Sequence, residues 1–252
     1  MSPGAPAPPL ETPALAVAGL AKDFGGLRAV SECSFEVATG SIVGLIGPNG
    51  SGKTTVFNLI TNLLRPDAGA VHFEGRRIDG LKTHQIARLG IGRTFQAVKI
   101  FRDLTVWDNL SIAAMGRERS GWEPTATTWL TRLGMLHLRD DPGDSLSVGQ
   151  QRLLELTMNL VVDPPFLMLD EPLAGVHPLV RQRIAETIRA LRSEGRTFLI
   201  IEHDMAFVME LCDKLVVMDH GNKIAEGVPA AIRRDPKVID ALLGRRHDVA
   251  SA

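Results

Sequence analysis

The residues GPNGSGKT, from Gly47 to Thr54, constrain the fold of this chain more than any other stretch. They match the pattern GxxxxGK[ST] and stand between an apolar segment that suits a strand and an apolar-periodic segment that suits a helix. Backbone amides can surround a phosphate group only where side chains are absent, which explains the glycines. At the usual glycine content, a chance match arises in about one such chain in a hundred. The stretch therefore predicts a strand–loop–helix unit that binds a nucleotide.

The polar residues of this loop have separate predicted roles. Lys53 can reach the β- and γ-phosphates, and the Thr54 hydroxyl can bind Mg²⁺. Thr55 adds a contact to the α-phosphate. The nucleotide is therefore expected to contact the whole loop, through Gly47, Pro48, Asn49, Gly50, Ser51, Gly52, Lys53, Thr54 and Thr55.

Regular alternation of strand and helix patterns favours an α/β fold with a mainly parallel sheet. A stretch from Ala97 to about Asp163 is mostly helical in pattern and reads as an insertion, with breaks expected at Gly116, Gly121, Pro124 and Pro142. We expect strands at 14–20, at 34–47 with a turn at 39–40, at 165–170 and at 196–203, hairpins at 68–78 and 214–227, and helices at 53–64, 83–90, 177–195 and 204–212.

The stretch FLMLDEP, from Phe166 to Pro172, reads as a buried strand that ends in two acids. At the carboxyl edge of a parallel sheet such acids lie in the ligand crevice. Asp170 is placed to hold Mg²⁺ through water, and Glu171 to polarise an attacking water near the γ-phosphate. The plainer alternative is an acid pair that caps the next helix.

Two further polar residues end predicted strands. His203 closes LIIEH, and the same sheet edge is expected to carry the phosphate loop, so we expect a contact with the γ-phosphate. Gln96, in GRTFQ, precedes the helical insertion, and its amide can bind Mg²⁺ or water and report its presence to the insertion. A structural histidine and an unremarkable glutamine are the alternatives.

The composition excludes several classes. A net charge of -1 argues against broad electrostatic capture of nucleic acid. Cys33 and Cys212 lie far apart without metal-ligand spacing, which favours reduced core thiols in a cytosolic protein. No apolar run is long enough to span a bilayer, and residues 1–12 read as a disordered Pro/Ala-rich leader rather than a signal peptide.

A second helix start able to hold an anion follows the insertion. SLSVGQQ places Ser147 and Gly149 directly before an apolar-periodic helix. An ordinary capped helix is the plainer alternative.

Together these motifs resemble the ATP-binding subunits of ABC transporters. The phosphate loop, Gln96, LSVGQQ, LMLDEP and His203 occur in that family's order, and the resemblance covers about residues 14–244. It implies a P-loop NTPase core, an N-terminal antiparallel β subdomain and a helical subdomain at about 97–163, within one domain of residues 13–244 before a flexible tail of 245–252. It also implies that two ATPase subunits, identical or related, pack head to tail around ATP and Mg²⁺. The partner's γ-phosphate would then meet Ser147, Gly149 and Gln150.

Finer features are similar to the LivG-type ATPases of branched-chain amino acid importers. These are FGGLRAV, GRTFQAVKIFRDLTVWDNL and the C-terminal EGVPAAIRRDPKVIDALLG. The resemblance implies an ATP-hydrolysing peripheral subunit at the cytoplasmic face of the inner membrane, partnered by integral-membrane permeases and indirectly by a periplasmic binding protein. It places Phe24 where the family stacks an aromatic ring on adenine, although an exposed hydrophobe at a strand end is equally plain. An importer of another amino acid, urea or an organic acid, a soluble ABC ATPase, and more remotely a P-loop kinase or GTPase remain alternatives.

Two departures from the family pattern bear on the site. Val148 replaces a common glycine, which we take to mean an ordinary backbone angle there. His177 stands where the family usually has aspartate, which puts cross-dimer hydrogen bonds of that loop in doubt. After Gln96, the apolar residues of VKIFRDLTVW form either core or a groove for a permease helix, and they are Val98, Ile100, Phe101, Leu104, Val106 and Trp107.

Overall fold

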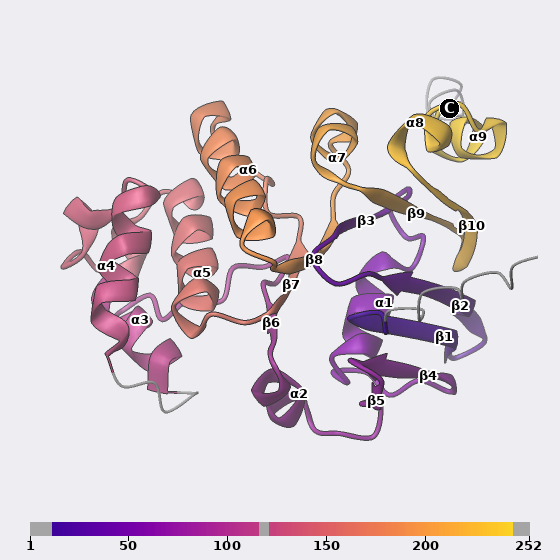
Figure 1. The fold of residues 1–252 in the computed structure, drawn as a ribbon, viewed down its shortest axis with the longest axis horizontal. Helices are drawn as coiled ribbons and strands as arrows, with labels where there is room; N and C mark the ends of the chain where they lie inside the picture. Colours follow the sequence, from indigo (N-terminus) through magenta and orange to yellow (C-terminus); the bar gives the residue numbers. More distant parts are fainter. Residues whose placement is uncertain (1–11, 116–120, 244–252) are drawn as a thin grey trace, which may run out of the picture.

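A computed structural model describes residues 12–115 and 121–243. Its centre is a mixed sheet in the order β5-β4-β1-β2-β10-β9-β3-β8-β7-β6 (Figure 1). The strands β6, β7, β8, β3 and β9 pair in parallel, whereas β1, β2, β4 and β5 pair antiparallel. The expected α/β class with a mainly parallel core and an antiparallel N-terminal layer is confirmed. The strands are β1 (Leu15–Phe24), β2 (Leu27–Val37), β3 (Ile42–Ile46), β4 (Ala68–Phe73), β5 (Arg76–Arg77), β6 (Ile91–Arg93), β7 (Phe166–Asp170), β8 (Thr197–Ile201), β9 (Lys214–Asp219) and β10 (Asn222–Gly227).

Helices cover both faces of this sheet. β3 shows why, since all five of its residues are buried and its side chains alternate between two hydrophobic clusters. Ile42 and Ile46 pack in one cluster, and Val43 and Leu45 in the other. The helices are α1 (Lys53–Ile60), α2 (Thr83–Leu89), α3 (Val106–Met115), α4 (Trp122–Arg132), α5 (Val148–Val162), α6 (Pro178–Ser193), α7 (Met205–Leu211), α8 (Pro229–Ile232) and α9 (Pro236–Leu243), with short 3₁₀ turns at Leu136–Leu138 and Gly143–Ser145.

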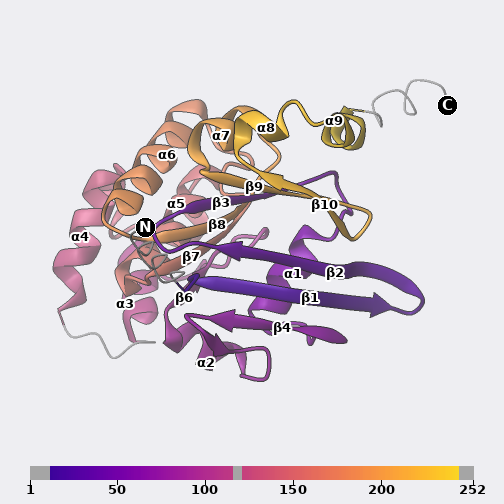
Figure 2. The same ribbon diagram turned by 45° about the vertical axis from the view of Figure 1, so that its right-hand side comes forward.

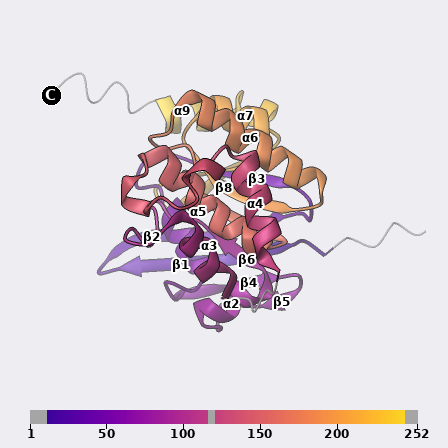
Figure 3. The ribbon, with the colours of Figure 1, turned by 90° about the vertical axis from the view of Figure 1, so that its left-hand side faces the viewer.

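The expected helical insertion leaves the sheet after β6 and returns at β7. α5 packs against α3 and α4. These three helices form one end of the molecule, and β1, β2 and β4 lie at the other (Figure 1). Figure 3 looks onto the helical end, with α3 and α4 in front of the core. In Figure 2 the antiparallel strands form a layer with α1 beside it.

Three sequence expectations are wrong in detail. The helix after the phosphate loop ends at Ile60 instead of Leu64, because Asn62 adopts a left-handed conformation with φ 52°. Pro124 does not break a helix, since it lies in the first turn of α4, where no intrahelical hydrogen bond is lost. The first strand runs on to Phe24, and the second begins at Leu27 instead of Ser34, because Phe24 and Leu27 pair in a hairpin.

Both cysteines are free and buried, as expected. Burial raises the pKa of Cys33 to about 11 and that of Cys212 to about 12. Within the described ranges, none of the helices is both long enough and apolar enough to cross a membrane. The expected leader (up to Glu11), the break at Gly116 and the expected tail lie outside the described residues.

Candidate functional site

The phosphate loop joins β3 to α1, and contacts with the backbone of neighbouring segments require its glycines. A Cβ atom at Gly47 would lie 2.1 Å from the carbonyl oxygen of Met218, and one at Gly52 would lie 2.4 Å from that of Ala29. Gly52 also has φ 100° at the N-terminus of α1, a region that other residues rarely adopt. The loop thereby presents backbone amides and the start of a helix to a cleft of about 430 Å³.

Lys53 is the first residue of α1 and has 7% of its surface exposed. Its Nζ donates hydrogen bonds to the carbonyl oxygens of Gly47 at 2.9 Å and Pro48 at 2.8 Å. Burial lowers the pKa of the Lys53 amine, and the nearby carboxylates of Glu171 and Asp170 oppose that shift. The amine is therefore positioned to meet an anion inside the loop.

Asp170 ends β7 and is 1% exposed. Among the described residues neither of its carboxyl oxygens has a hydrogen-bond partner, and the nearest cation is Arg93, whose Nη2 lies 3.7 Å from Oδ2. Burial raises the pKa of Asp170, while Arg93 opposes the rise. Buried carboxylate oxygens without hydrogen-bond donors are the kind of ligand that suits Mg²⁺.

Glu171 follows with a left-handed backbone conformation of φ 48°, held by a hydrogen bond from its amide to the carbonyl of Ile201. A positive φ is uncommon for a non-glycine residue and often marks a functional site. His203 Nδ1 lies 3.9 Å from Glu171 Oε1, and its side chain is 63% exposed. Both residues line a second cleft, of about 560 Å³, together with Gly47 and Gln96.

The two clefts share Asn49, Gln96 and Glu171. The structure thus brings the phosphate loop, Glu171, His203 and Gln96 to one edge of the sheet. This is the arrangement expected when parallel strands end together.

Sequence reasoning missed Glu202, which precedes His203. Its carboxylate is 1% exposed and accepts hydrogen bonds from the amides of Leu173, His203 and Asp204. It therefore ties the loop after β7 to the loop after β8. Burial is the largest cause of its raised pKa. An acid at the end of an apolar strand was the available signal.

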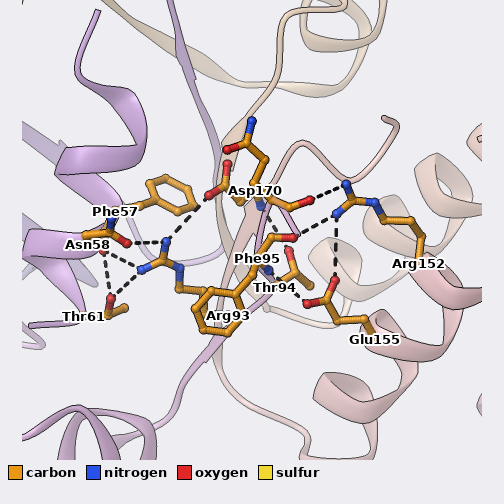
Figure 4. A network of polar contacts seen from close by, with 10 residues as sticks. Phe57, Asn58, Thr61, Arg93, Thr94, Phe95, Arg152, Glu155 and Asp170 are labelled. Atoms are coloured by element: carbon orange, nitrogen blue, oxygen red, sulfur yellow. Dashed lines mark hydrogen bonds and ion pairs between the residues drawn. The ribbon is translucent and has the colours of Figure 1, made fainter. Parts of the chain in front are cut away.

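Sequence reasoning also missed the network around Arg93, Arg152 and Glu155 (Figure 4). Arg93 donates to the carbonyl of Phe57, the hydroxyl of Thr61 and the amide oxygen of Asn58, all at the end of α1. Its guanidinium also lies over the rings of Phe57 and Phe95. The partners on α1 lie more than thirty residues away in sequence, so no local pattern could predict them.

Residues Ser147–Gln150, which we call the signature segment, form a capped helix start at the beginning of α5. Ser147 Oγ accepts a hydrogen bond from the amide of Gln150 at 3.3 Å, and Gln150 Oε1 accepts one from the amide of Ser147 at 2.8 Å. Val148 is the first residue of α5 and has no positive φ, as expected. Ser147 is exposed, and the segment from Ser147 to Gln150 lines neither cleft.

Two predicted positions are less well placed. Phe24 is 44% exposed with Lys22 Nζ 5.7 Å from its ring centre, whereas Leu27 and Arg28 line the cleft beside the loop. Adenine stacking on Phe24 stays a prediction. His177 caps α6, where its Nδ1 accepts a hydrogen bond from the amide of Leu179 at 3.3 Å.

Comparison with known families decides the class of this protein. Residues 30–174 match the model described as ABC transporter. The chain belongs to the ABC transporter family. Residues 222–248 also match the model described as branched-chain amino acid ATP-binding cassette transporter. This ABC ATPase is 42% identical to the high-affinity branched-chain amino acid transport ATP-binding protein LivG of Salmonella typhimurium, over 93% of this chain and 99% of the relative. It is 39% identical to the corresponding BraF protein of Pseudomonas aeruginosa, with the same coverage.

Solved structures agree with this assignment. A nucleotide-free ATP-binding cassette of an ABC transporter superposes with a TM-score of 0.84 at 33% identity, covering 92% of this chain and 99% of that one. A cassette in its ADP conformation gives 0.83 at 34% identity with the same coverage. This chain is thus a nucleotide-binding ABC ATPase, the ATP-binding subunit of a transporter.

Proposed function

We propose that this ABC ATPase hydrolyses ATP to drive an importer of branched-chain amino acids. The observation that carries the proposal is the cradle at Gly47–Thr54 beside the acid pair Asp170–Glu171, in a chain whose similar relatives bear names that specify branched-chain amino acid transport. The match of residues 222–248 to the branched-chain model supports the substrate class. No observation favours one of the alternative classes over this one.

The residues of the cleft take complementary roles in this proposal. Lys53 and the loop amides bind the phosphates, and Lys53 neutralises charge that develops on the γ-phosphate. Thr54, Asp170 and Gln96 hold Mg²⁺, which supplies charge neutralisation when bound. Glu171 accepts a proton from the attacking water. His203, whose Nδ1 lies 3.9 Å from Glu171 Oε1, orients that water and the γ-phosphate.

A second ATPase subunit completes the site. Lys53 is buried in its loop while Ser147 lies exposed on a helix start that lines neither cleft, so one subunit supplies only half of an enclosure. In a head-to-tail pair, Ser147, Gly149 and Gln150 of each subunit approach the γ-phosphate held by the other, aided by the positive end of α5.

The apolar residues after Gln96 divide between core and surface. Val106 is fully buried and Trp107 packs between Trp122 and Arg139, whereas Phe101 is 47% exposed, so a permease groove at this stretch stays a proposal. A second candidate surface for the permease is a mainly apolar cleft of about 500 Å³. It is lined by residues of α2, of β6 and of the ends of α1, α3 and α5, among them Leu63, Ala87, Phe95, Ala113 and Val162. A short amphipathic segment of a permease fits this cleft.

The proposed contacts also imply a domain organisation and a location for this ATPase. We propose one ATPase domain at residues 13–244, with the helical subdomain at about 97–163. Binding to permeases would place it peripherally on the cytoplasmic face of the membrane, with a periplasmic binding protein acting through the permeases.

Uptake in intact cells tests the proposal. A strain that lacks this gene should lose high-affinity uptake of labelled leucine, and the wild-type gene should restore it whereas Glu171→Gln should not. Uptake of labelled urea in the same strains serves as the control. Normal leucine uptake with loss of urea uptake would assign the protein to another importer.

A further inference from the structure

The loop that carries Gln96 is bound to α5 by buried charged side chains (Figure 4). Glu155 Oε1 accepts hydrogen bonds from the amides of Phe95 at 3.1 Å and Lys99 at 3.2 Å. The guanidinium of Arg152 donates to the carbonyl of Phe95 at 2.9 Å and to that of Gln96 at 2.6 Å. Two side chains of α5 thus hold the backbone on both sides of Gln96.

Three of these contacts are partly buried, and the hydrogen bond from Arg152 to the carbonyl of Gln96 is exposed. Glu155 is 3% exposed, and the side chain of Arg152 is 9% exposed, with 4.0 Å between Nη1 and Glu155 Oε2. Buried ionic groups are costly to separate from their partners, so the loop cannot leave α5 without exposing or orphaning both charges. We call Arg152, Glu155 and the segment Phe95–Lys99 the clamp.

α5 carries the clamp and the signature segment on one continuous helix. Glu155 lies eight residues after Ser147, which corresponds to roughly 12 Å along the helix axis. The helix has no described break between them, and it packs against α3 and α4. A displacement of the loop at Gln96 therefore moves Ser147 with it.

We propose that Glu155 and Arg152 are positioning residues that make Gln96 and Ser147 of one subunit move as a unit. This inference rests on the proposed function, in which Gln96 contacts the ligands of its own ATP site and Ser147 completes the ATP site of the partner. The clamp then links the two ATP sites of the dimer. Occupancy sensed at Gln96 in one site sets the position of the serine that closes the other.

A double-mutant cycle distinguishes this linkage from a merely structural role of Glu155. All variants carry Glu171→Gln, and light scattering measures the association constant of the dimer in MgATP. We expect Gln96→Ala and Glu155→Leu each to lower that constant about tenfold. The double variant should also lower it about tenfold in total rather than about a hundredfold, because both changes interrupt one path. Binding of MgATP to the monomer by Glu155→Leu should stay within about twofold of the parent.

The controls separate the outcomes. Glu155→Gln keeps an oxygen for the two amides, so it should recover part of the association constant, and it carries the cycle if Glu155→Leu fails to fold. Glu186→Leu, on α6 and exposed, should combine additively with Gln96→Ala. Additive effects of Gln96→Ala and Glu155→Leu, or an unchanged association constant in Glu155→Leu, would overturn the linkage. If the parent Glu171→Gln variant binds no MgATP, or forms a dimer without it, the proposed function itself is wrong. The proposed linkage of the two ATP sites is then wrong as well.

Discussion

Two helix starts in this molecule offer backbone amides to an anion, and the fold surrounds them very differently. At the start of α1, Lys53 is buried, two clefts adjoin the loop, and Glu171, directly after β7, lines both of them. At the start of α5, Ser147 is exposed and satisfies the helix end with its own side chain and that of Gln150. The start of α1 therefore lies beside clefts, whereas the start of α5 lies on the exposed surface.

This difference explains why one chain carries two such features. In the proposed function, the buried cradle binds a triphosphate alone but leaves the γ-phosphate side open. The capped, exposed start of α5 lines neither of the two clefts, and it would close a pocket on another molecule. The comparison predicts that defects at α1 affect binding, whereas defects at α5 affect only steps that need two subunits.

Replacement of the base should have the largest effect. Glu171→Gln should lower ATP turnover about 10²- to 10⁴-fold, because an amide cannot accept the proton of the attacking water. Binding of MgATP should persist, measured by calorimetry. Turnover close to that of the wild type would show that Glu171 is not the general base.

A charge at the exposed helix start should separate the two regions. Ser147→Glu should lower ATP turnover about 100-fold or more, because a carboxylate facing the partner's γ-phosphate repels it. Binding of ATP to a single subunit should remain that of the wild type. Ser145→Glu, two residues earlier and also exposed, is the matched control and should retain turnover. Equal losses in both variants would show that the helix, not the serine, was damaged.

Removal of the buried amine should weaken binding within one subunit. Lys53→Ala should raise the dissociation constant for ATP about 10- to 100-fold, since a charge-assisted hydrogen bond contributes roughly 1.5–3 kcal/mol. Titration of a fluorescent ATP analogue measures the change. Lys237→Ala, on α9, is the control. An unaltered affinity in Lys53→Ala would contradict the assignment of the α1 pocket.

The smallest effect concerns the acid that joins the loops after β7 and β8. Because burial raises the pKa of Glu202 above the ordinary 4.5, its protonation stabilises the folded state below that pH, and this contribution is lost as pH rises through the folded-state pKa. The free energy of unfolding of the wild type, relative to Glu202→Gln, should therefore fall as the pH rises above 4.5 in urea titrations. A difference that stays constant with pH would contradict the raised pKa.

Local patterns predicted the parts of the site that depend on local chemistry. We could predict the phosphate loop from Gly47 to Thr54 because phosphate binding requires particular residues within one short stretch. The acids at the end of β7 were predictable because they directly follow an apolar strand pattern. The contacts of Arg93 and Glu155 were not predictable, because each joins segments dozens of residues apart. The early end of α1 depends on the left-handed Asn62, which no periodicity records. The apolar cleft beside α2 arises from five elements and has no sequence pattern of its own.

The most direct measurement asks whether nucleotide joins two subunits through Ser147. Light scattering of Glu171→Gln should give the mass of a dimer with MgATP and of a monomer with MgADP. Adding Ser147→Glu to the same variant should return the monomer while MgATP stays bound. A monomer that binds MgATP and remains single in Glu171→Gln, or a dimer indifferent to Ser147→Glu, would contradict the claim that each subunit closes the ATP site of the other.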